Sequence, residues 1–176
     1  QNIAFSDLAL DGGMVGNGLF LLNVLRARLS GLYVVNYYKD GVVVQKGHEV
    51  DIHDSFFGQC DTVACPGQTQ PPQKPPVNSS VNIGSTAIVL AGNDHFVHDC
   101  VIFNGAGIGI LDTGGANAFE GIHMYGMGSP NGGSGPGGSW TPPVDENGTA
   151  LTRGGIVMTG FGWQSRVVNN YFDGQD

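Results

Sequence analysis

Two histidine–aspartate pairs are the first residues in this sequence whose types and spacing suit a chemical role. They are His53-Asp54 and His98-Asp99, and each pair occupies the same place in a repeated pattern. On neighbouring strands about 4.8 Å apart, two imidazoles stacked with two carboxylates can bind a metal ion or exchange protons. The alternative is a solvated structural ladder, because a repeated coil stacks identical residues without any chemical purpose.

An aromatic-rich set of outward positions is a second candidate site. In each repeat, the residues that flank the last apolar position point away from the core, since side chains alternate along a strand. Aromatic rings stack on the apolar faces of pyranoses, so the stripe predicts a sugar-binding platform. The alternative is that inserted loops cover the stripe, which then fills a second core. Its ring-bearing members are Tyr33, Phe56, Phe103, His123, Tyr125 and Tyr171.

The elements that position these side chains are encoded by a six-residue pattern that occurs six times. An apolar residue is followed three positions later by a small, polar or apolar residue, and two positions after that by a second apolar residue. The copies are Phe5-Leu8-Leu10, Leu29-Leu32-Val34, Ile52-Ser55-Phe57, Val97-Cys100-Ile102, Phe119-Ile122-Met124 and Val167-Asn170-Phe172. Their first members are separated by 24, 23, 45, 22 and 48 positions. A period in the low twenties, with short alternating segments broken by Gly, Asn and Asp, predicts an all-β, right-handed parallel β-helix of about six coils.

The domain organisation follows from the length and from the two long steps of the repeat. A chain of 176 residues can bury one sizeable core, so we expect one β-helix domain over residues 1–176. Each long step contains a Pro/Gly-rich insertion, about 60–84 and about 129–154, and both leave the same point of the repeat. They are therefore expected to wall one face of the solenoid. The sequence begins and ends within a coil, so we expect a segment without caps, joined to further coils or copies of itself.

Composition narrows the function classes. The net charge is −8, which disfavours general nucleic-acid binding, and no apolar run is long enough to span a bilayer. We expect neither a cofactor nor a resident metal. Glycine, at 30 of 176 residues, is expected to occupy the many turn positions that need a positive φ.

Cysteines and glycosylation sequons indicate the compartment. We predict a disulfide between Cys60 and Cys65 that closes a small loop in the first insertion, with two free thiols as the alternative. Cys100 occupies a small buried slot of the repeat and is expected to be a structural thiol. Sequons begin at Asn78 and Asn147, one in each insertion. Together these features predict a secreted, extracellular glycoprotein.

Several short stretches carry a family resemblance. They are Lys39–Glu49 (KDGVVVQKGHE), Ser55–Gln59 (SFFGQ), Gly92–Asp94 (GND), Val101–Phe103 (VIF) and Gly107–Ile110 (GIGI). Over roughly residues 2 to 128 the sequence resembles the plant QUARTET-type polygalacturonases, which are right-handed β-helices of the pectin-lyase-like superfamily. The resemblance implies a glycoside hydrolase that acts on an acidic, pectin-type polysaccharide.

The resemblance also implies catalytic residues. Pectinases of this kind carry an Asn-Thr-Asp-Gly motif at the place of Tyr38-Lys39-Asp40-Gly41, so Asp40 matches one catalytic acid. An Asp-Asp pair should end the next coil, where only Asp61 is present. The later Gly-His-Gly motif reads Gly105-Ala106-Gly107, and the Arg-Ile-Lys motif has no counterpart. Inverting hydrolysis needs two carboxyls about 6.5–9.5 Å apart, which residues one or two coils apart satisfy.

Basic residues complete the predicted site. Four of the seven Lys and Arg side chains fall in coils two and three, and this clustering suits a carboxylated sugar, whereas the alternative is a solvated edge. They are Arg26, Arg28, Lys39 and Lys46. We expect Lys39 and Lys46 to hold substrate carboxylates by charge-assisted hydrogen bonds. The glycan is expected to lie beside Asp40, across the stripe that contains Tyr33, His123, Tyr125 and Tyr171.

Three functions remain open from the sequence. The first is the secreted polygalacturonase-like hydrolase. The second is a non-catalytic extracellular β-helix that binds glycan or builds a wall or filament. The third is a polysaccharide lyase, which needs a Ca²⁺-binding acid cluster and a Lys or Arg base, and no convincing cluster stands out in the sequence.

Overall fold

Strands and turns make up the described part of the chain. The structure, a computed structural model, describes residues 2–12, 18–37, 39–58, 86–103, 105, 107–127, 148–151, 154–159 and 164–173. Within these ranges there are seventeen strands and no helix, so no helix capable of crossing a membrane is found there.

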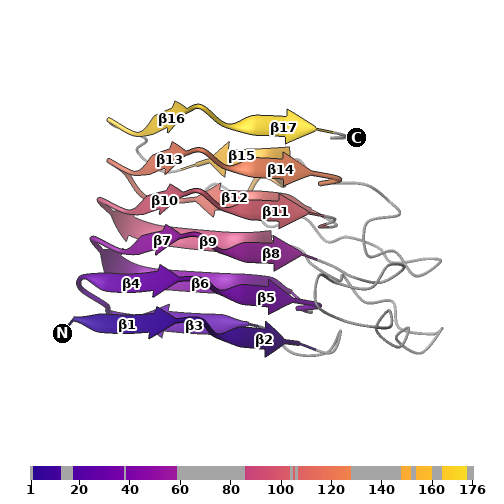
Figure 1. Cartoon of the computed structure of the whole chain (residues 1–176). Helices are drawn as coiled ribbons and strands as arrows, with labels where there is room; N and C mark the ends of the chain where they lie inside the picture. Colours follow the sequence, from indigo (N-terminus) through magenta and orange to yellow (C-terminus); the bar gives the residue numbers. More distant parts are fainter. Residues whose placement is uncertain are drawn as a thin grey trace.

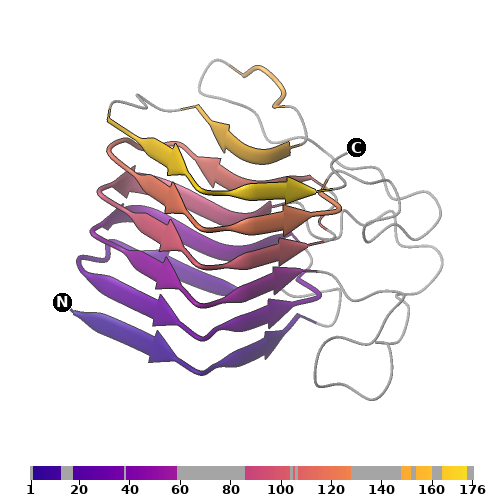
Figure 2. The same cartoon turned by 45° about the horizontal axis from the view of Figure 1, so that its top comes forward.

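The strands form three parallel sheets, and successive turns of the chain add one strand to each (Figure 1). Sheet A contains β1 (Ile3–Ser6), β4 (Ala27–Ser30), β7 (Asp51–His53), β10 (Phe96–His98), β13 (Ala118–Glu120) and β16 (Arg166–Val168). Sheet B contains β2 (Ala9–Asp11), β5 (Tyr33–Val35), β8 (Phe56–Gly58), β11 (Val101–Phe103), β14 (His123–Tyr125) and β17 (Tyr171–Asp173). Sheet C contains β3 (Leu19–Leu22), β6 (Asp40–His48), β9 (Thr86–Asn93), β12 (Ile108–Asp112) and β15 (Gly154–Met158). Sheets A and B meet at an angle, with sheet C behind them (Figure 2). This is the predicted right-handed parallel β-helix of about six coils.

The register of the strands is the register of the sequence repeat. The first apolar positions pair in sheet A, as in Phe5 with Leu29 and Ile52 with Val97. The second apolar positions pair in sheet B, as in Val34 with Phe57. In the middle coils these side chains are fully buried in one core shared by all three sheets. Each such side chain contributes about 1.5–3 kcal/mol of hydrophobic stabilisation, so the repeat encodes both the register and the core.

A two-residue turn joins sheet A to sheet B in every coil, and its first residue has a positive φ. These residues are Asp7, Gly31, Asp54, Asp99, Gly121 and Asn169. The expectation that glycine would fill such positions is wrong for most of them, because the described residues with positive φ include twelve non-glycines and five glycines. Asp and Asn tolerate this conformation, since their short polar side chains hydrogen-bond locally. Gly58 serves close packing instead: a Cβ there would lie 2.1 Å from Cε1 of Phe103.

Polar side chains in one coil cap backbone N–H groups of the coil before it. In the turn between sheets A and B, Oγ of Ser55 accepts the N–H of Leu32 (3.0 Å). Three coils later, Oδ1 of Asn170 accepts the N–H of Ile122 (2.9 Å). In both pairs the acceptor comes from the following coil, at the middle position of the repeat.

The turn between sheets C and A carries a second set of caps with the same direction. Nδ1 of His95 accepts the N–H of Val50 (3.2 Å), and Oδ1 of Asn117 accepts the N–H of His95 (2.8 Å). Oγ of Ser165 then accepts the N–H of Asn117 (3.2 Å). Because an unpaired buried N–H costs about 1–3 kcal/mol, these side chains hold successive coils together.

Candidate functional site

A groove on the outer face of sheet C contains the carboxylate that was predicted to be catalytic. Asp40 is the first residue of β6 and follows the short turn from sheet B. Along β6, Val42 and Val44 are buried in the core, so Val43 and Gln45 project outward. The groove has a volume of about 390 Å³ and is lined by Leu19, Phe20, Lys39, Asp40, Val43, Val44, Gln45, Val89 and Ala91.

Burial changes the acidity of this carboxyl. The pKa of Asp40 is raised above its ordinary value by burial, and the neighbouring positive charge of Lys39 opposes part of that effect. A carboxyl that holds its proton to higher pH than an exposed aspartate is suited to general-acid catalysis. Among the described residues that line the groove, Asp40 is the only acid. The second predicted acid, Asp61, lies outside the described residues.

The rest of the groove is mostly apolar. Phe20 pairs with Val43 across the strands and is 58% exposed, and Val89 continues the same row on β9. An exposed ring, an apolar floor, one cation and one acid therefore line the groove. Phe20 was not predicted from the sequence, because β3 (LFLL) is apolar at every position and only its burial pattern places Phe20 outward.

Lys46 is not brought to this groove. It is exposed, has a φ of 55°, and lies where the pairing of β6 with β9 shifts register between Gln45 and Gly47. Six residues of strand separate it from Asp40, which corresponds to about 20 Å. The structure therefore brings Lys39 but not Lys46 together with Asp40.

The aromatic stripe lies on the outer face of sheet B, as the repeat predicted. Tyr33 stacks on Phe56 with ring centroids 5.2 Å apart, and Phe56 contacts Phe103 at 4.7 Å. Phe103 stacks on Tyr125 at 5.6 Å. His123 then contacts both Tyr125 (5.1 Å) and Tyr171 (5.0 Å). The rings form one continuous row, and none of them lines the groove of Asp40.

Part of this stripe is packed as a small hydrophobic cluster. Val35 and Phe103 are 1% and 6% exposed, and Tyr33 and Tyr125 pack against them. Burial raises the pKa of both tyrosines. Tyr171, at the other end of the row, is 59% exposed. Tyr171 lies on β17, the edge strand of sheet B.

The two histidine–aspartate pairs stack on the outer face of sheet A. The rings of His53 and His98 lie 4.9 Å apart and within 9° of parallel. Each Nδ1 hydrogen-bonds the carboxylate of the next residue, Asp54 (2.8 Å) or Asp99 (2.7 Å). Oδ1 of Asp51 lies 3.3 Å from Nε2 of His98. In the part of the chain that the structure describes, no group of three or more His, Cys, Asp or Glu side chains is arranged to hold a metal ion.

Three buried polar residues were not anticipated from the sequence. His95 and Asn117 lie in the turns between sheets C and A of successive coils, and Asp112 is the last residue of β12; each is at most 1% exposed. Oδ1 of Asp112 accepts hydrogen bonds from Nδ2 of Asn117 (2.8 Å) and from the N–H of Gly114 (2.9 Å), and burial raises its pKa. Burial lowers the pKa of His95 to about 4, and the charge of His48 acts in the same direction. These groups face the core, so they support the fold and do not contact a ligand.

Cys100 is a buried free thiol, as predicted. Its Sγ donates to the carbonyl oxygen of His98 (3.2 Å), and burial raises its pKa to about 12. Two other predictions lie outside the described residues: the disulfide between Cys60 and Cys65, and the glycosylation sites Asn78 and Asn147.

Comparison with known proteins supports the family resemblance. The chain is 31% identical over 174 residues to polygalacturonase QRT3 of Arabidopsis thaliana, and the match covers 98% of this chain. It covers 30% of that protein, so the chain spans about a third of the length of its relative. No family model matches the chain, and no solved structure matches it. The chain is therefore a distant homologue of a polygalacturonase over nearly all of its length.

Proposed function

We propose that this β-helix binds an acidic, pectin-type polysaccharide and hydrolyses it with Asp40 as general acid. The observation that carries the proposal is the Asp40 carboxyl, whose pKa is raised by burial in a groove beside Lys39. The homology to polygalacturonase QRT3 supports the substrate class. Hydrolysis is preferred over binding alone because burial raises the pKa of this carboxyl, the direction that a general acid requires.

Each residue of the groove has a role in this proposal. Asp40 protonates the glycosidic oxygen, and Lys39 holds a substrate carboxylate through a charge-assisted hydrogen bond. Phe20 packs against the apolar face of a sugar ring. Asp61 serves as the base that activates water, which requires its carboxyl to lie about 6.5–9.5 Å from that of Asp40.

The test is reducing-sugar release from polygalacturonate by the wild type and by Asp40→Asn. The variant is nearly isosteric and should leave folding intact, while loss of the proton donor lowers the rate by about 10²-fold or more. Asp7→Asn is the matched control, because Asp7 is exposed in a turn between sheets A and B and should keep full activity. Full activity of Asp40→Asn would exclude Asp40 as the acid.

The second candidate function is glycan binding without catalysis. It is favoured by the presence of only one acid among the described groove residues and by the exposed end of the aromatic stripe at Tyr171. In this case the purified protein releases no sugar but binds oligogalacturonate, and Tyr171→Ala weakens binding. Hydrolysis by the wild type would reject this alternative.

We also propose that the protein acts outside the cell. Support comes from the sequons at Asn78 and Asn147 and from the Cys60 and Cys65 pair, together with the kinship to a polygalacturonase. Protein purified from its natural source should lose mass on enzymatic deglycosylation. An unchanged mass would count against the glycans.

A further inference from the structure

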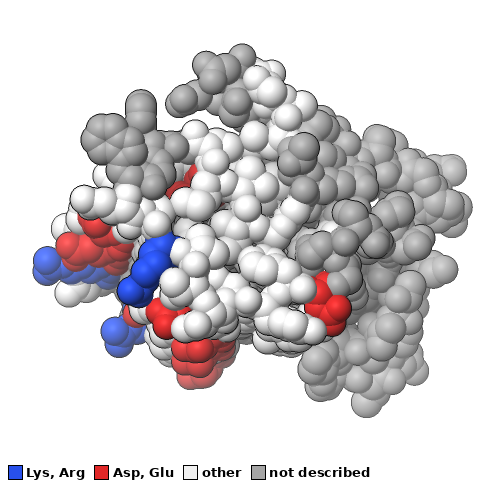
Figure 3. Space-filling view, turned by 90° about the horizontal axis from the view of Figure 1, so that it is seen from above, with Lys and Arg blue, Asp and Glu red and all other residues white. Residues whose placement is uncertain are grey.

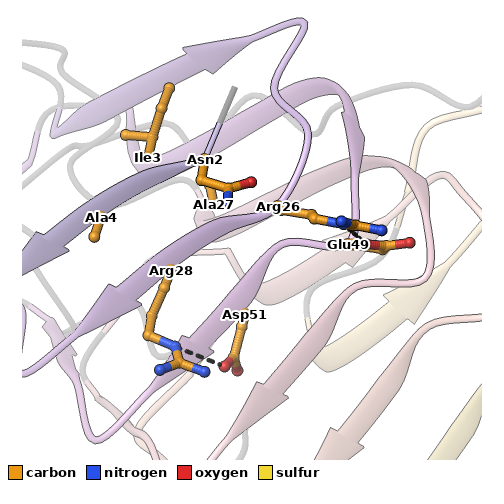
Figure 4. A pocket seen from close by; sticks show the side chains of 8 residues that line it. All are labelled: Asn2, Ile3, Ala4, Arg26, Ala27, Arg28, Glu49 and Asp51. Atoms are coloured by element: carbon orange, nitrogen blue, oxygen red, sulfur yellow. Dashed lines mark hydrogen bonds and ion pairs between the residues drawn. The ribbon is translucent and has the colours of Figure 1, made fainter.

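A second groove lies on the outer face of sheet A, at the end formed by β1, β4 and β7 (Figure 4). Its volume is about 380 Å³. The polar side chains that line it are Asn2, Arg26, Arg28, Glu49 and Asp51. Ala4 pairs with Arg28 across the sheet, and its small side chain leaves room beside the guanidinium. No residue is shared with the groove of Asp40, which lies on sheet C.

The two arginines are held in place by carboxylates of the following coil. Nε of Arg26 donates to Glu49 (2.6 Å), and Nε of Arg28 lies 3.4 Å from Asp51. Both side chains remain largely exposed, at 64% and 67%. In both ion pairs Nε is the guanidinium nitrogen that faces the carboxylate. A guanidinium has five donors in a fixed fork, so one edge can stay on its own carboxylate while the other receives a ligand.

The spacing of the arginines suits a ligand with more than one carboxylate. Arg26 lies in the turn before β4, with a φ of 58°, and Arg28 lies within β4, two residues further along the chain. Seen along the stack, the coloured Lys and Arg side chains gather with acidic ones on the side where sheet A begins (Figure 3). The charged groups of this groove sum to zero, in a protein whose net charge is −8. An acidic polymer therefore meets less repulsion here than from the protein as a whole.

We infer that this groove is a second binding site for a carboxylated polysaccharide, remote from the groove of Asp40. Arg26 and Arg28 bind successive carboxylates of the polymer through their terminal Nη groups, and Glu49 and Asp51 keep the guanidiniums oriented. The inference rests on the proposed function for the identity of the polymer, but it requires no catalysis at this groove. The site anchors a long chain whose other part lies across sheet C.

The test compares binding of oligogalacturonate by Arg26→Gln, Arg28→Gln and the control Arg166→Gln, all in the Asp40→Asn background so that the probe stays intact. Arg166 is a fair control, because it lies on sheet A and pairs with Glu120 (3.3 Å) at 61% exposure. Loss of a hydrogen bond between charged groups weakens binding by about tenfold or more. We expect this loss of affinity for Arg26→Gln and for Arg28→Gln, whereas the affinity of Arg166→Gln should stay within about twofold of that of the Asp40→Asn parent. Arg28→Lys keeps the charge but loses the planar fork of the guanidinium, so its affinity should lie between those of Arg28→Gln and the parent.

Several outcomes overturn the inference. Unchanged affinity in both groove variants rejects the site, and an equal loss in Arg166→Gln shows that only overall charge matters. Equal binding of a neutral galactose oligomer shows that carboxylates are not recognised. Thermal melting confirms that each variant is folded. In the Asp40-intact protein, the arginine variants should still cleave short oligomers at the parental rate, so this inference and the proposed function fail separately.

Discussion

Acidification should destabilise this β-helix through His95, a residue outside both proposed binding grooves. The ring is 1% exposed, and its Nδ1 accepts the N–H of Val50. The neutral ring therefore carries its proton on Nε2, and a second proton has to go to Nδ1. That protonation breaks the hydrogen bond to Val50 and places a charge in the core. Burial is the main reason that the pKa of His95 is lowered to about 4.

The size of the effect follows from the difference between the folded and unfolded chains. An unfolded histidine has a pKa of about 6.5, so between that pH and about 4 the unfolded chain binds a proton that the folded chain does not. The contribution to stability is complete above about pH 6.5 and is lost progressively as the pH falls to about 4. The two pKa values differ by about 2.5, which amounts to a loss of about 3 kcal/mol. Asp40 and Asp112 act in the opposite direction, because their pKa values are raised in the folded protein.

The assay isolates His95 by comparing the wild type with His95→Asn. Asparagine keeps an acceptor for the N–H of Val50, as Asn117 does for His95 itself, but it does not titrate. Urea unfolding followed by far-UV circular dichroism gives the free energy of unfolding at pH 7 and at pH 4. The wild type should lose about 3 kcal/mol more than the variant over this range. Equal losses in the two proteins would refute the assignment.

Two further predictions concern buried positions, one a tightly packed glycine and the other a buried thiol. Gly58→Ala places a Cβ 2.1 Å from the ring of Phe103, so it should displace the ring and cost about 1–3 kcal/mol. Gly154→Ala is the control, since its nearest atom would be 4.0 Å away, and thermal melting should show a marked decrease only for Gly58→Ala. Cys100, with a pKa of about 12, should resist iodoacetamide at about pH 8 until the protein unfolds, because the thiolate is the reactive form. Peptide mapping that finds rapid alkylation in the native protein would contradict this.

The sequence was sufficient to predict the coils because the repeat is itself the pairing register. Phe5, Leu29 and Ile52 are equivalent in the pattern and pair directly in sheet A. Alternation then placed the aromatic stripe of sheet B on the outside. These properties depend on local periodicity and burial, which the sequence records position by position.

The candidate groove was harder to predict from the repeat. The resemblance to polygalacturonases pointed to Asp40, but its association with Phe20 depends on sheet C, whose strands lie outside the six-residue pattern. The two residues come from successive coils and meet only once β3 pairs with β6. His95 was not predicted for a related reason. It occupies a position of the repeat where the preceding coil has the apolar Val50, so the sequence does not mark it as a buried polar site. The stack of His95 below Asn117 becomes evident only after the coils are aligned.

The hydrogen bonds that cap one coil with side chains of the following coil have a consequence for folding during translation. The N–H of Leu32 finds its acceptor in Ser55, 23 residues later, and that of Val50 finds its acceptor in His95, 45 residues later. A ribosome makes the N-terminal part first, so the coils with these caps emerge with buried donors that only the next coil can satisfy. Folding of the nascent solenoid should therefore lag translation by about one coil. If translation pauses after a donor has been made but before its acceptor, the most recently made coil keeps buried N–H groups without hydrogen bonds.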